Sequence, residues 1–363
     1  MIIDCDVHNS LASTDELKPY LSKYWREMLK LGGVPIGPNN YRSPIGVLRS
    51  DAQTSDEGIP GSDPDYLIEH HMQAYGIDYC VLTGSGILGI SVGTDPDFSN
   101  AISTAYNQNL ADRWLNTSSR FLGSILINHS DPQYAAKEID RVAKDRRFVQ
   151  VLMGSGSRIP FGQRFYHPIY EAAERNGLPV AFHPGSEGAG ISEAPTPAGY
   201  PTRYFEWHNI LPTNYMAQVN SLVCEGVFEK FPGLKVVAIE GGISWLPHLM
   251  WRMDKNYKAL RSTTPWLKRM PSEYILDHIR FTTQPIEEPQ KPRHLEQMFE
   301  MVDAQKTVMF SSDYPHWDND APDQVLRFLK GDTRERIYWK NAVELYGLDL
   351  PVFRNGKKEI CHV

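Results

Sequence analysis

Eight short apolar segments, spread along the chain and separated by helical patterns, constrain the fold more than any other feature of this sequence. Most of them are runs of Val, Ile, Leu and Phe without polar alternation, as expected for parallel strands that are covered on both faces. The segments are residues 1–8, 78–84, 121–128, 148–154, 179–184, 234–241, 279–284 and 307–314. Eight strands alternating with helices predict an α/β fold, a closed (β/α)8 TIM barrel; an open doubly wound sheet is the alternative.

Amphipathic helical patterns fill most of the intervals between these segments. Asp131 and Pro132 are the residue types of a helix N-cap and first turn, and they predict a helix that begins there. The other predicted helices cover residues 66–75, 100–116, 168–176, 246–260, 294–302, 323–329 and 334–346.

Two long segments interrupt the alternation, at about residues 30–64 and 186–204, and both are rich in Gly, Pro and Ser. Each follows a predicted strand, so in a barrel both are loop insertions at the catalytic face; surface decoration is the alternative. No repeat divides the chain. Residues 1–363 are therefore predicted to form a single domain, with a C-terminal tail from about residue 350.

Charge and composition narrow the class of partner. The formal net charge is −7 and there is no basic run, which argues against a nucleic-acid partner. No apolar stretch reaches the roughly 18–20 residues of a membrane helix, and the N-terminus has no signal-peptide pattern. Four widely spaced cysteines without a CxxC pair suit reduced thiols in the cytoplasm. A small-molecule substrate is the expected partner.

The first predicted strand ends in acidic and imidazole side chains, with Asp4, Asp6 and His8 at alternate positions. Strict alternation places these three on one face, the barrel lumen, and turns Cys5 away from it into core packing. An isolated Asp-x-His pair is more often structural than functional. A metal-binding role therefore depends on which other side chains lie beside the pair.

Three other predicted strands also end in ligand-type residues: His183 in the fifth, Glu240 in the sixth and Asp313 in the eighth. Taken singly, His183 suits a buried core histidine and Asp313 suits a helix cap. Because the carboxyl ends of all barrel strands lie at one face, these residues and the first-strand pair are expected to converge. Imidazole and carboxylate ligands together suit zinc, manganese or iron.

Further candidates lie in the predicted loops. His316 follows Asp313 and is a candidate for substrate contact or proton relay, with turn structure as the alternative. Trp207 and His208 follow the second long loop and are candidates for the pocket wall. Arg42 and Arg49 lie in the first long loop, where an arginine could bind a substrate carboxylate; a solvated loop charge is the alternative for both.

Several of these segments resemble the amidohydrolase superfamily, in the branch that holds aminocarboxymuconate semialdehyde decarboxylase and γ-resorcylate decarboxylase. The matching segments are residues 3–8, 182–185, 231–235, 240–242 and 310–316. The resemblance implies one divalent cation held by Asp6, His8, His183 and Asp313. Segment 148–154 lacks the bridging lysine of binuclear members, which favours a single ion. Asp6 stands where the superfamily usually has histidine, and this oxygen ligand favours zinc or manganese.

The same resemblance implies a decarboxylase of a small carboxylated cyclic or aromatic compound. The branch often has a proton-transferring histidine where this chain has Glu240, which is either an acid–base group or a partner that orients His183. One alternative is hydrolysis of an amide, ester, lactone or activated C–C bond by metal-bound water, with Asp313 as base. Another is a non-catalytic metal- or ligand-binding barrel. A homodimer is expected by resemblance alone.

Overall fold

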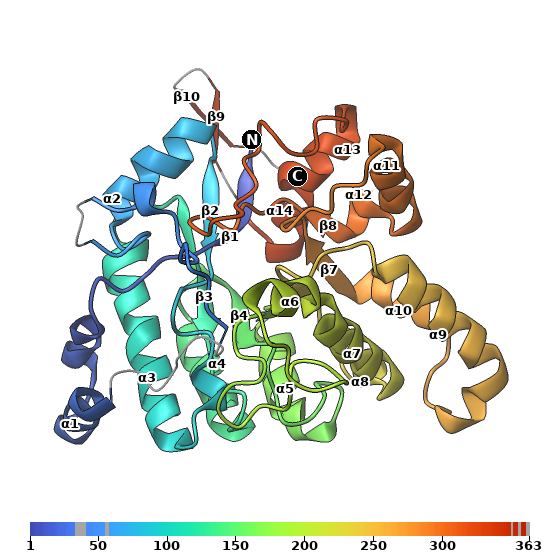
Figure 1. Cartoon of the computed structure of the whole chain (residues 1–363), viewed down its shortest axis with the longest axis horizontal. Helices are drawn as coiled ribbons and strands as arrows, with labels where there is room; N and C mark the ends of the chain where they lie inside the picture. Colours follow the sequence, from blue (N-terminus) through green and yellow to red (C-terminus); the bar gives the residue numbers. More distant parts are fainter. Residues whose placement is uncertain (33–40, 55–57, 350, 355–356, 361–363) are drawn as a thin grey trace.

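A computed structural model describes residues 1–32, 41–54, 58–349, 351–354 and 357–360. One sheet of eight parallel strands runs in chain order (Figure 1). The strands are β1 (Ile3–Val7), β2 (Tyr79–Leu82), β3 (Phe121–Leu126), β4 (Phe148–Gly154), β5 (Val180–His183), β6 (Val236–Ala238), β7 (Ile279–Thr282) and β8 (Val308–Met309). The sheet closes where the Cys5 amide donates to the Phe310 carbonyl at 2.9 Å and Val7 pairs with Tyr314. This closure confirms the (β/α)8 barrel and rules out the open sheet.

Helices and helical turns follow the strands and surround the barrel (Figure 1). The longer helices are α1 (Lys23–Gly32), α3 (Pro96–Asn109), α4 (Pro132–Val142), α5 (His167–Arg175), α7 (Leu211–Cys224), α9 (Leu246–Leu260), α10 (Pro271–His278) and α11 (Pro292–Met301). The shorter ones are α2 (Pro64–Leu67), α6 (Tyr204–Asn209), α8 (Val227–Lys230), α12 (Ala304–Thr307), α13 (Gly331–Glu335) and α14 (Asn341–Tyr346). The 3-10 helices are η1 (Thr14–Tyr20), η2 (Ser50–Ala52), η4 (Ile90–Val92), η6 (Arg164–Tyr166) and η7 (Arg261–Thr263). The π-helical segments are η3 (Ile68–Gln73), η5 (Leu110–Leu115) and η8 (Arg336–Lys340). Among the described residues, no helix is long and apolar enough to cross a bilayer.

Most predicted helices are present, and one is wrong. The Asp131 carboxylate accepts a hydrogen bond from the Tyr134 amide at 3.2 Å and caps α4, as predicted. The predicted helix 323–329 is absent, because Leu326 has a left-handed backbone (φ 53°) that ends any regular helix there. Leu326 and Leu329 reach the core from irregular chain instead.

The long predicted loops lie at the carboxyl ends of the strands where they are described. No helix or strand occurs between β5 and α6, which covers the predicted segment 186–204 except Tyr204, where α6 begins. In the first loop, Leu48 pairs with His316, so this segment lies against the chain that follows β8. Residues 33–40 and 55–57 of that loop lie outside the described residues.

Part of the predicted C-terminal tail forms two paired strands. Strand β9 (Pro351–Arg354) pairs antiparallel with β10 (Lys357–Ile360). Residues 361–363 lie outside the described part of the chain.

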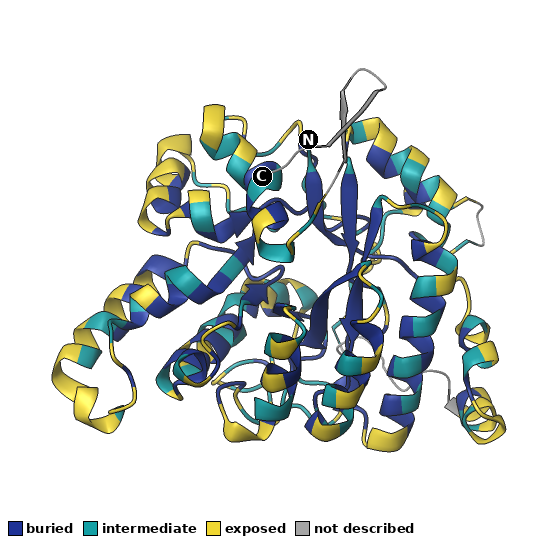
Figure 2. Cartoon of the chain, turned by 180° about the vertical axis from the view of Figure 1, so that it is seen from behind, coloured by how far each residue is buried: buried dark blue, intermediate teal, exposed yellow. Residues whose placement is uncertain are grey.

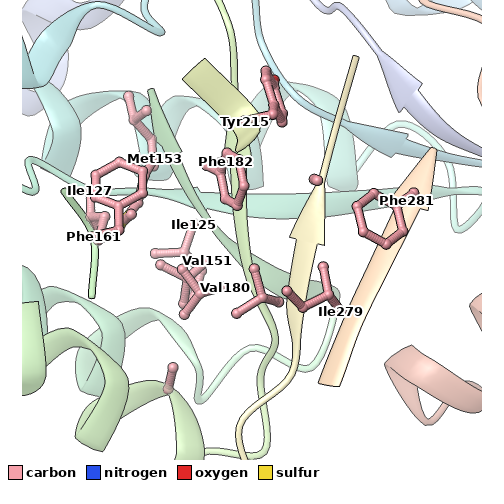
Figure 3. Packing of buried hydrophobic residues seen from close by; sticks show 14 of the residues in the cluster. Ile125, Ile127, Val151, Met153, Phe161, Val180, Phe182, Tyr215, Ile279 and Phe281 are labelled. Atoms are coloured by element: carbon pink, nitrogen blue, oxygen red, sulfur yellow. The ribbon is translucent and has the colours of Figure 1, made fainter. Parts of the chain in front are cut away.

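Two apolar layers hold the barrel, one on each side of the sheet. Inside the lumen, short and branched side chains from successive strands pack together, among them Ile3, Val81, Leu152 and Val237. Between the sheet and the helices lies a larger layer that includes the residues of Figure 3, such as Phe182. Figure 2 shows the resulting gradient, with buried strands and exposed outer helix faces. A sheet covered on both faces explains the unbroken apolar runs in the sequence.

Strand β1 departs from strict alternation, which corrects the predicted orientations of two residues. Its register with β2 shifts between Asp4 and Val7. Cys5 therefore packs in the lumen cluster instead of facing away from it. Asp4 pairs with His71 at 2.9 Å, away from the side chains of Asp6 and His8. The extra residue of an irregular strand changes which side chains share a face.

Candidate metal centre

Five ligand-type side chains meet where the strands end: Asp6, His8, His183, Glu240 and Asp313. One potential ligand atom from each lies within 4.8 Å of all the others. The first two come from β1 and the residue after it, and the others end or follow β5, β6 and β8. The side chains expected to converge from four separate strands are thus brought together.

The distances within this cluster are those of groups that face a common centre. His8 Nε2 lies 2.9 Å from Asp313 Oδ1 and 3.5 Å from Asp6 Oδ1. His183 Nε2 lies 3.4 Å from Asp6 Oδ2 and 3.1 Å from Glu240 Oε2. The four predicted ligands are almost completely buried. Such a concentration of carboxylates in a buried site needs positive charge to balance it.

Backbone carbonyl groups fix how the two histidines present their rings. His8 Nδ1 lies 2.5 Å from the Gly84 carbonyl oxygen, and His183 Nδ1 lies 2.9 Å from the Pro184 carbonyl oxygen. Because a carbonyl only accepts, each Nδ1 carries the proton and each Nε2 offers its lone pair to the cluster. This is the tautomer that a metal-binding histidine requires.

Three buried atoms in the cluster, Asp6 Oδ2, His8 Nε2 and His183 Nε2, make no hydrogen bond within the described residues. Leaving such atoms without a partner costs about 1–3 kcal/mol each. A divalent cation satisfies all three at once. The mixed nitrogen and oxygen donor set fits zinc or manganese.

Two of the clustered carboxylates lie on strained backbone. Glu240 (φ 59°) and Asp313 (φ 62°) both have left-handed conformations, which are unfavourable for residues other than glycine. The Glu240 amide donates to Thr282 Oγ1 at 3.0 Å, and the Asp313 amide donates to the Asp6 carbonyl at 3.1 Å. Strain of this kind, held by neighbouring hydrogen bonds, is common at functional sites.

His316 forms an ion pair with the cluster. Its Nδ1 lies 2.6 Å from Asp313 Oδ1. Burial alone lowers the pKa of His316, but the Asp313 carboxylate outweighs it and raises the pKa to about 9. Burial and the charge of His316 lower the pKa of His8, which keeps His8 neutral and suited to coordinate a metal.

Glu240 has the opposite character from Asp313. Burial, followed by the charges of Asp313 and Asp6, raises the pKa of Glu240 well above its ordinary value. Burial alone raises the pKa of Asp313, but the neighbouring His316 outweighs it and keeps that pKa low. The site therefore contains one carboxyl group that favours the acid form and one that favours the ionised form. The positive charge of a bound cation opposes the shift at Glu240.

A cavity of about 410 Å³ opens beside the cluster. Trp207 and His208, which the sequence placed at the pocket, both line it. Trp207 stacks on Tyr41 with 5.7 Å between ring centroids, and His208 Nε2 lies 3.5 Å from Asp318 Oδ2. The remaining lining residues are His8, Tyr41, Arg42, Ser43, Gly46, Val47, Ser85, Gly86, Leu88, Gly89, His183, Pro184, Gly185, Tyr204, Glu240, Asp313, His316 and Asp318.

Arg49 is the predicted site residue that the structure does not bring to the cavity. Its guanidinium binds the Asp51 carboxylate at 2.6 Å and donates to Asn319 Oδ1 at 2.6 Å, while Arg42 lines the cavity. Thr83, which the sequence analysis missed, donates to Asp6 Oδ1 at 2.6 Å. Its only sequence signal is a polar residue at the end of the second predicted strand.

Comparisons with known proteins agree with this architecture. The γ-resorcylate decarboxylase of a Polaromonas species is 25% identical over 300 residues, covering 77% of this chain and 86% of the relative. A dihydroxybenzoic acid decarboxylase from Polaromonas, solved with manganese and the inhibitor 2-nitroresorcinol, superposes with a TM-score of 0.68 at 19% identity, covering 96% of this chain and 97% of that one. A 5-carboxyvanillate decarboxylase from Novosphingobium aromaticivorans, solved with manganese, gives 0.70 at 22% identity and covers 96% of each chain.

The model of one protein family, described as Amidohydrolase, matches residues 3–348. The match spans all eight barrel strands and the whole ligand-type cluster. It confirms the superfamily that the sequence segments resembled. This chain belongs to the amidohydrolase family.

Proposed function

We propose that this protein is a metal-dependent decarboxylase that acts on a small aromatic or cyclic carboxylic acid. The observation that carries the proposal is the cluster itself. Two Nε2 atoms and one carboxylate oxygen are buried there without a hydrogen-bond partner in the described part of the chain, beside a cavity of about 410 Å³. The named decarboxylases among the relatives favour this chemistry. A site beside a substrate-sized cavity argues against a purely structural or non-catalytic role.

In this proposal Asp6, His8, His183 and Asp313 hold one zinc or manganese ion. When bound, the ion supplies an electrophilic anchor for the oxygens of a substrate carboxylate. The chain's own groups prepare that anchor: the carbonyls behind the two histidines fix their tautomers, and His316 keeps Asp313 ionised. A rigid donor set of this kind lowers the cost of organising the site for reaction.

Decarboxylation breaks the bond between the ring carbon and the carboxylate and leaves an electron pair on that carbon, which must receive a proton. Glu240 is the group we assign to deliver it, since its pKa is raised by burial and nearby carboxylates and its Oε2 lies within the cluster. His316 is a second proton-holding group on the cavity wall, with a pKa raised to about 9 by Asp313 against the effect of burial.

The cavity wall suggests the shape and charge of the substrate. Tyr41, Tyr204 and Trp207 supply aromatic surface on which a flat ring can pack, and His208 adds a hydrogen-bonding edge. Arg42 supplies the positive charge for a second acidic substituent, a role that the sequence suggested for Arg49 as well.

Hydrolysis is the second candidate, and the same carboxylates favour it. Asp313 is ionised within the cluster and could accept a proton from an attacking water. Glu240, where the related decarboxylases often have histidine, would then act on the leaving group. The two reactions differ in product: only decarboxylation releases carbon dioxide.

We also propose that residues 1–363 form a single domain that assembles as a homodimer and works in the cytoplasm. Light scattering on the purified protein measures the assembly directly, with a mass near twice the 41.3 kDa of one chain expected.

A substrate panel separates the two candidate reactions. Purified protein loaded with manganese or zinc is incubated with hydroxybenzoates, carboxyvanillate and muconate semialdehyde acids, and in parallel with lactones, esters and amides. We expect metal-dependent release of carbon dioxide from at least one acid, in equal amounts with the ring product. Turnover of lactones, esters or amides without gas would establish the hydrolase instead.

A further inference from the structure

Asp4 is a fully buried carboxylate that lies outside the metal cluster. It belongs to β1, two residues before Asp6, and the irregularity of this strand turns it away from the cluster. A buried carboxylate is costly unless hydrogen bonds surround it. The groups that surround Asp4 are therefore informative about what it does.

Both carboxylate oxygens of Asp4 accept two hydrogen bonds. Oδ1 accepts from the backbone amides of Ser312 at 2.9 Å and Asp6 at 3.3 Å. Oδ2 accepts from Ser312 Oγ at 2.6 Å and lies 2.9 Å from His71 Nε2, which donates to it. The carboxylate thus ties β1 to the chain that follows β8, across the seam where the barrel closes.

The residues held in this way flank two of the proposed metal ligands. Ser312 immediately precedes Asp313, and its Oγ accepts from the Tyr314 amide at 3.1 Å. The strained, left-handed Asp313 is therefore held on one side by Ser312, which binds Asp4 directly, and on the other by Tyr314, whose amide binds Ser312 Oγ. The direct bond from the Asp6 amide to Asp4 fixes the second ligand.

His71 anchors this arrangement to the helical layer. It lies in η3, and its ring stacks on Tyr314 with 4.2 Å between centroids and 15° between planes. Tyr314 Oη in turn lies 2.8 Å from His70 Nδ1. The position of the β8 loop is thus set by an aromatic contact as well as by hydrogen bonds.

We infer that Asp4, together with His71 and Ser312, is a positioning group that sets the placement of Asp6 and Asp313 for cation binding. The inference rests on the proposed metal ligands, but it does not depend on which reaction the site catalyses. Groups that orient metal ligands typically change metal affinity about 10- to 100-fold when they are replaced.

The test is manganese affinity of the metal-free protein, measured by calorimetry together with the electron paramagnetic resonance spectrum of the bound ion. Asp4→Asn replaces one carboxylate oxygen, which accepts hydrogen bonds, with an NH2 group, which donates them. This NH2 group would face groups that themselves donate to Asp4, so hydrogen bonds are lost. His71→Phe keeps an aromatic ring against Tyr314 but removes the hydrogen bond to Asp4. We expect both variants to bind manganese about 10- to 100-fold more weakly and to show an altered spectrum.

A matched control is His278→Phe. His278 is also buried, stacks on Phe228 at 4.5 Å and lies 2.9 Å from a backbone carbonyl, but it precedes β7 at the opposite end of the barrel. Its replacement is expected to lower the unfolding temperature without changing manganese affinity or the spectrum.

Where Asp4→Asn does not fold, Ser312→Ala makes the same comparison. Its control is Ser103→Ala, because Ser103 is buried in α3 and its Oγ donates to the Ser99 carbonyl at 2.9 Å, away from the cluster. Wild-type affinity and spectrum in the folded Asp4, His71 or Ser312 variants would overturn the inference. Absence of decarboxylation would leave the affinity comparison intact, so the two proposals fail separately.

Discussion

Asp313→Asn is expected to reduce the affinity for manganese or zinc by about 100-fold or more and to abolish metal-dependent activity. The variant removes the negative charge of a buried carboxylate. Its Oδ1 lies 2.9 Å from His8 Nε2 and 2.6 Å from His316 Nδ1. Removing one partner from a buried charge pair costs about 3–5 kcal/mol, and 1.4 kcal/mol is a factor of ten in affinity. The measurement is metal content after dialysis, by atomic emission, together with calorimetric titration.

Asp320→Asn is the matched control, since Asp320 is a partly buried carboxyl in the same loop but outside the cluster. Burial raises the pKa of Asp320 to about 7, so an uncharged amide is a small change there. Its metal content is expected to equal that of the wild type. Unchanged metal binding in Asp313→Asn would remove Asp313 from the ligand set.

Glu240→Gln is expected to retain manganese binding within about tenfold and to lose activity by about 10²–10⁴-fold, the usual contribution of a general acid. Glutamine preserves the size and polarity of the side chain but carries no exchangeable acid proton. Burial and the charges of Asp313 and Asp6 raise the pKa of Glu240, and a bound cation opposes that shift. The acid form of Glu240 is lost as pH rises through the pKa that this carboxyl group has in the metal-loaded protein. The wild-type rate should therefore fall as the pH is raised into the alkaline range. The residual rate of the variant should not show this fall.

Glu138→Gln, on α4, controls for loss of a buried glutamate. Glu138 pairs with Arg141 outside the cavity, so its replacement is expected to affect stability and not rate. A Glu240→Gln variant with full activity and a wild-type pH profile would show that Glu240 is not the proton donor.

The barrel was predictable because its strands are buried on both faces. A run such as the apolar strand Phe148–Gly154 records this burial directly, and the proline and glycine positions mark where the chain turns. Helices α1, α7 and α10 and the shorter α6, α8 and α12 were missed, and the segment 323–329 was wrongly assigned. In these segments the positions of the apolar residues depend on contacts with neighbouring elements. The local periodicity of the sequence does not reveal such contacts.

The convergence of the site was predictable for a related reason. In a parallel barrel, polar residues at strand ends share one face whatever their separation in sequence, so Asp6, His183 and Asp313 were expected to meet. The orientation of Asp4 was wrong because pairing with β2 inserts an irregularity that one strand cannot reveal. Arg49 was misplaced toward the cavity because its partner Asn319 lies 270 residues away.

The measurement that tests one-metal decarboxylation most directly is carbon dioxide release as manganese is added to metal-free protein, with an acid that the panel shows to be turned over. We expect no release without metal, a rise that saturates at one ion per chain, and one ring product for each carbon dioxide. Release from metal-free protein, saturation at two ions per chain, or product formation without gas would contradict it.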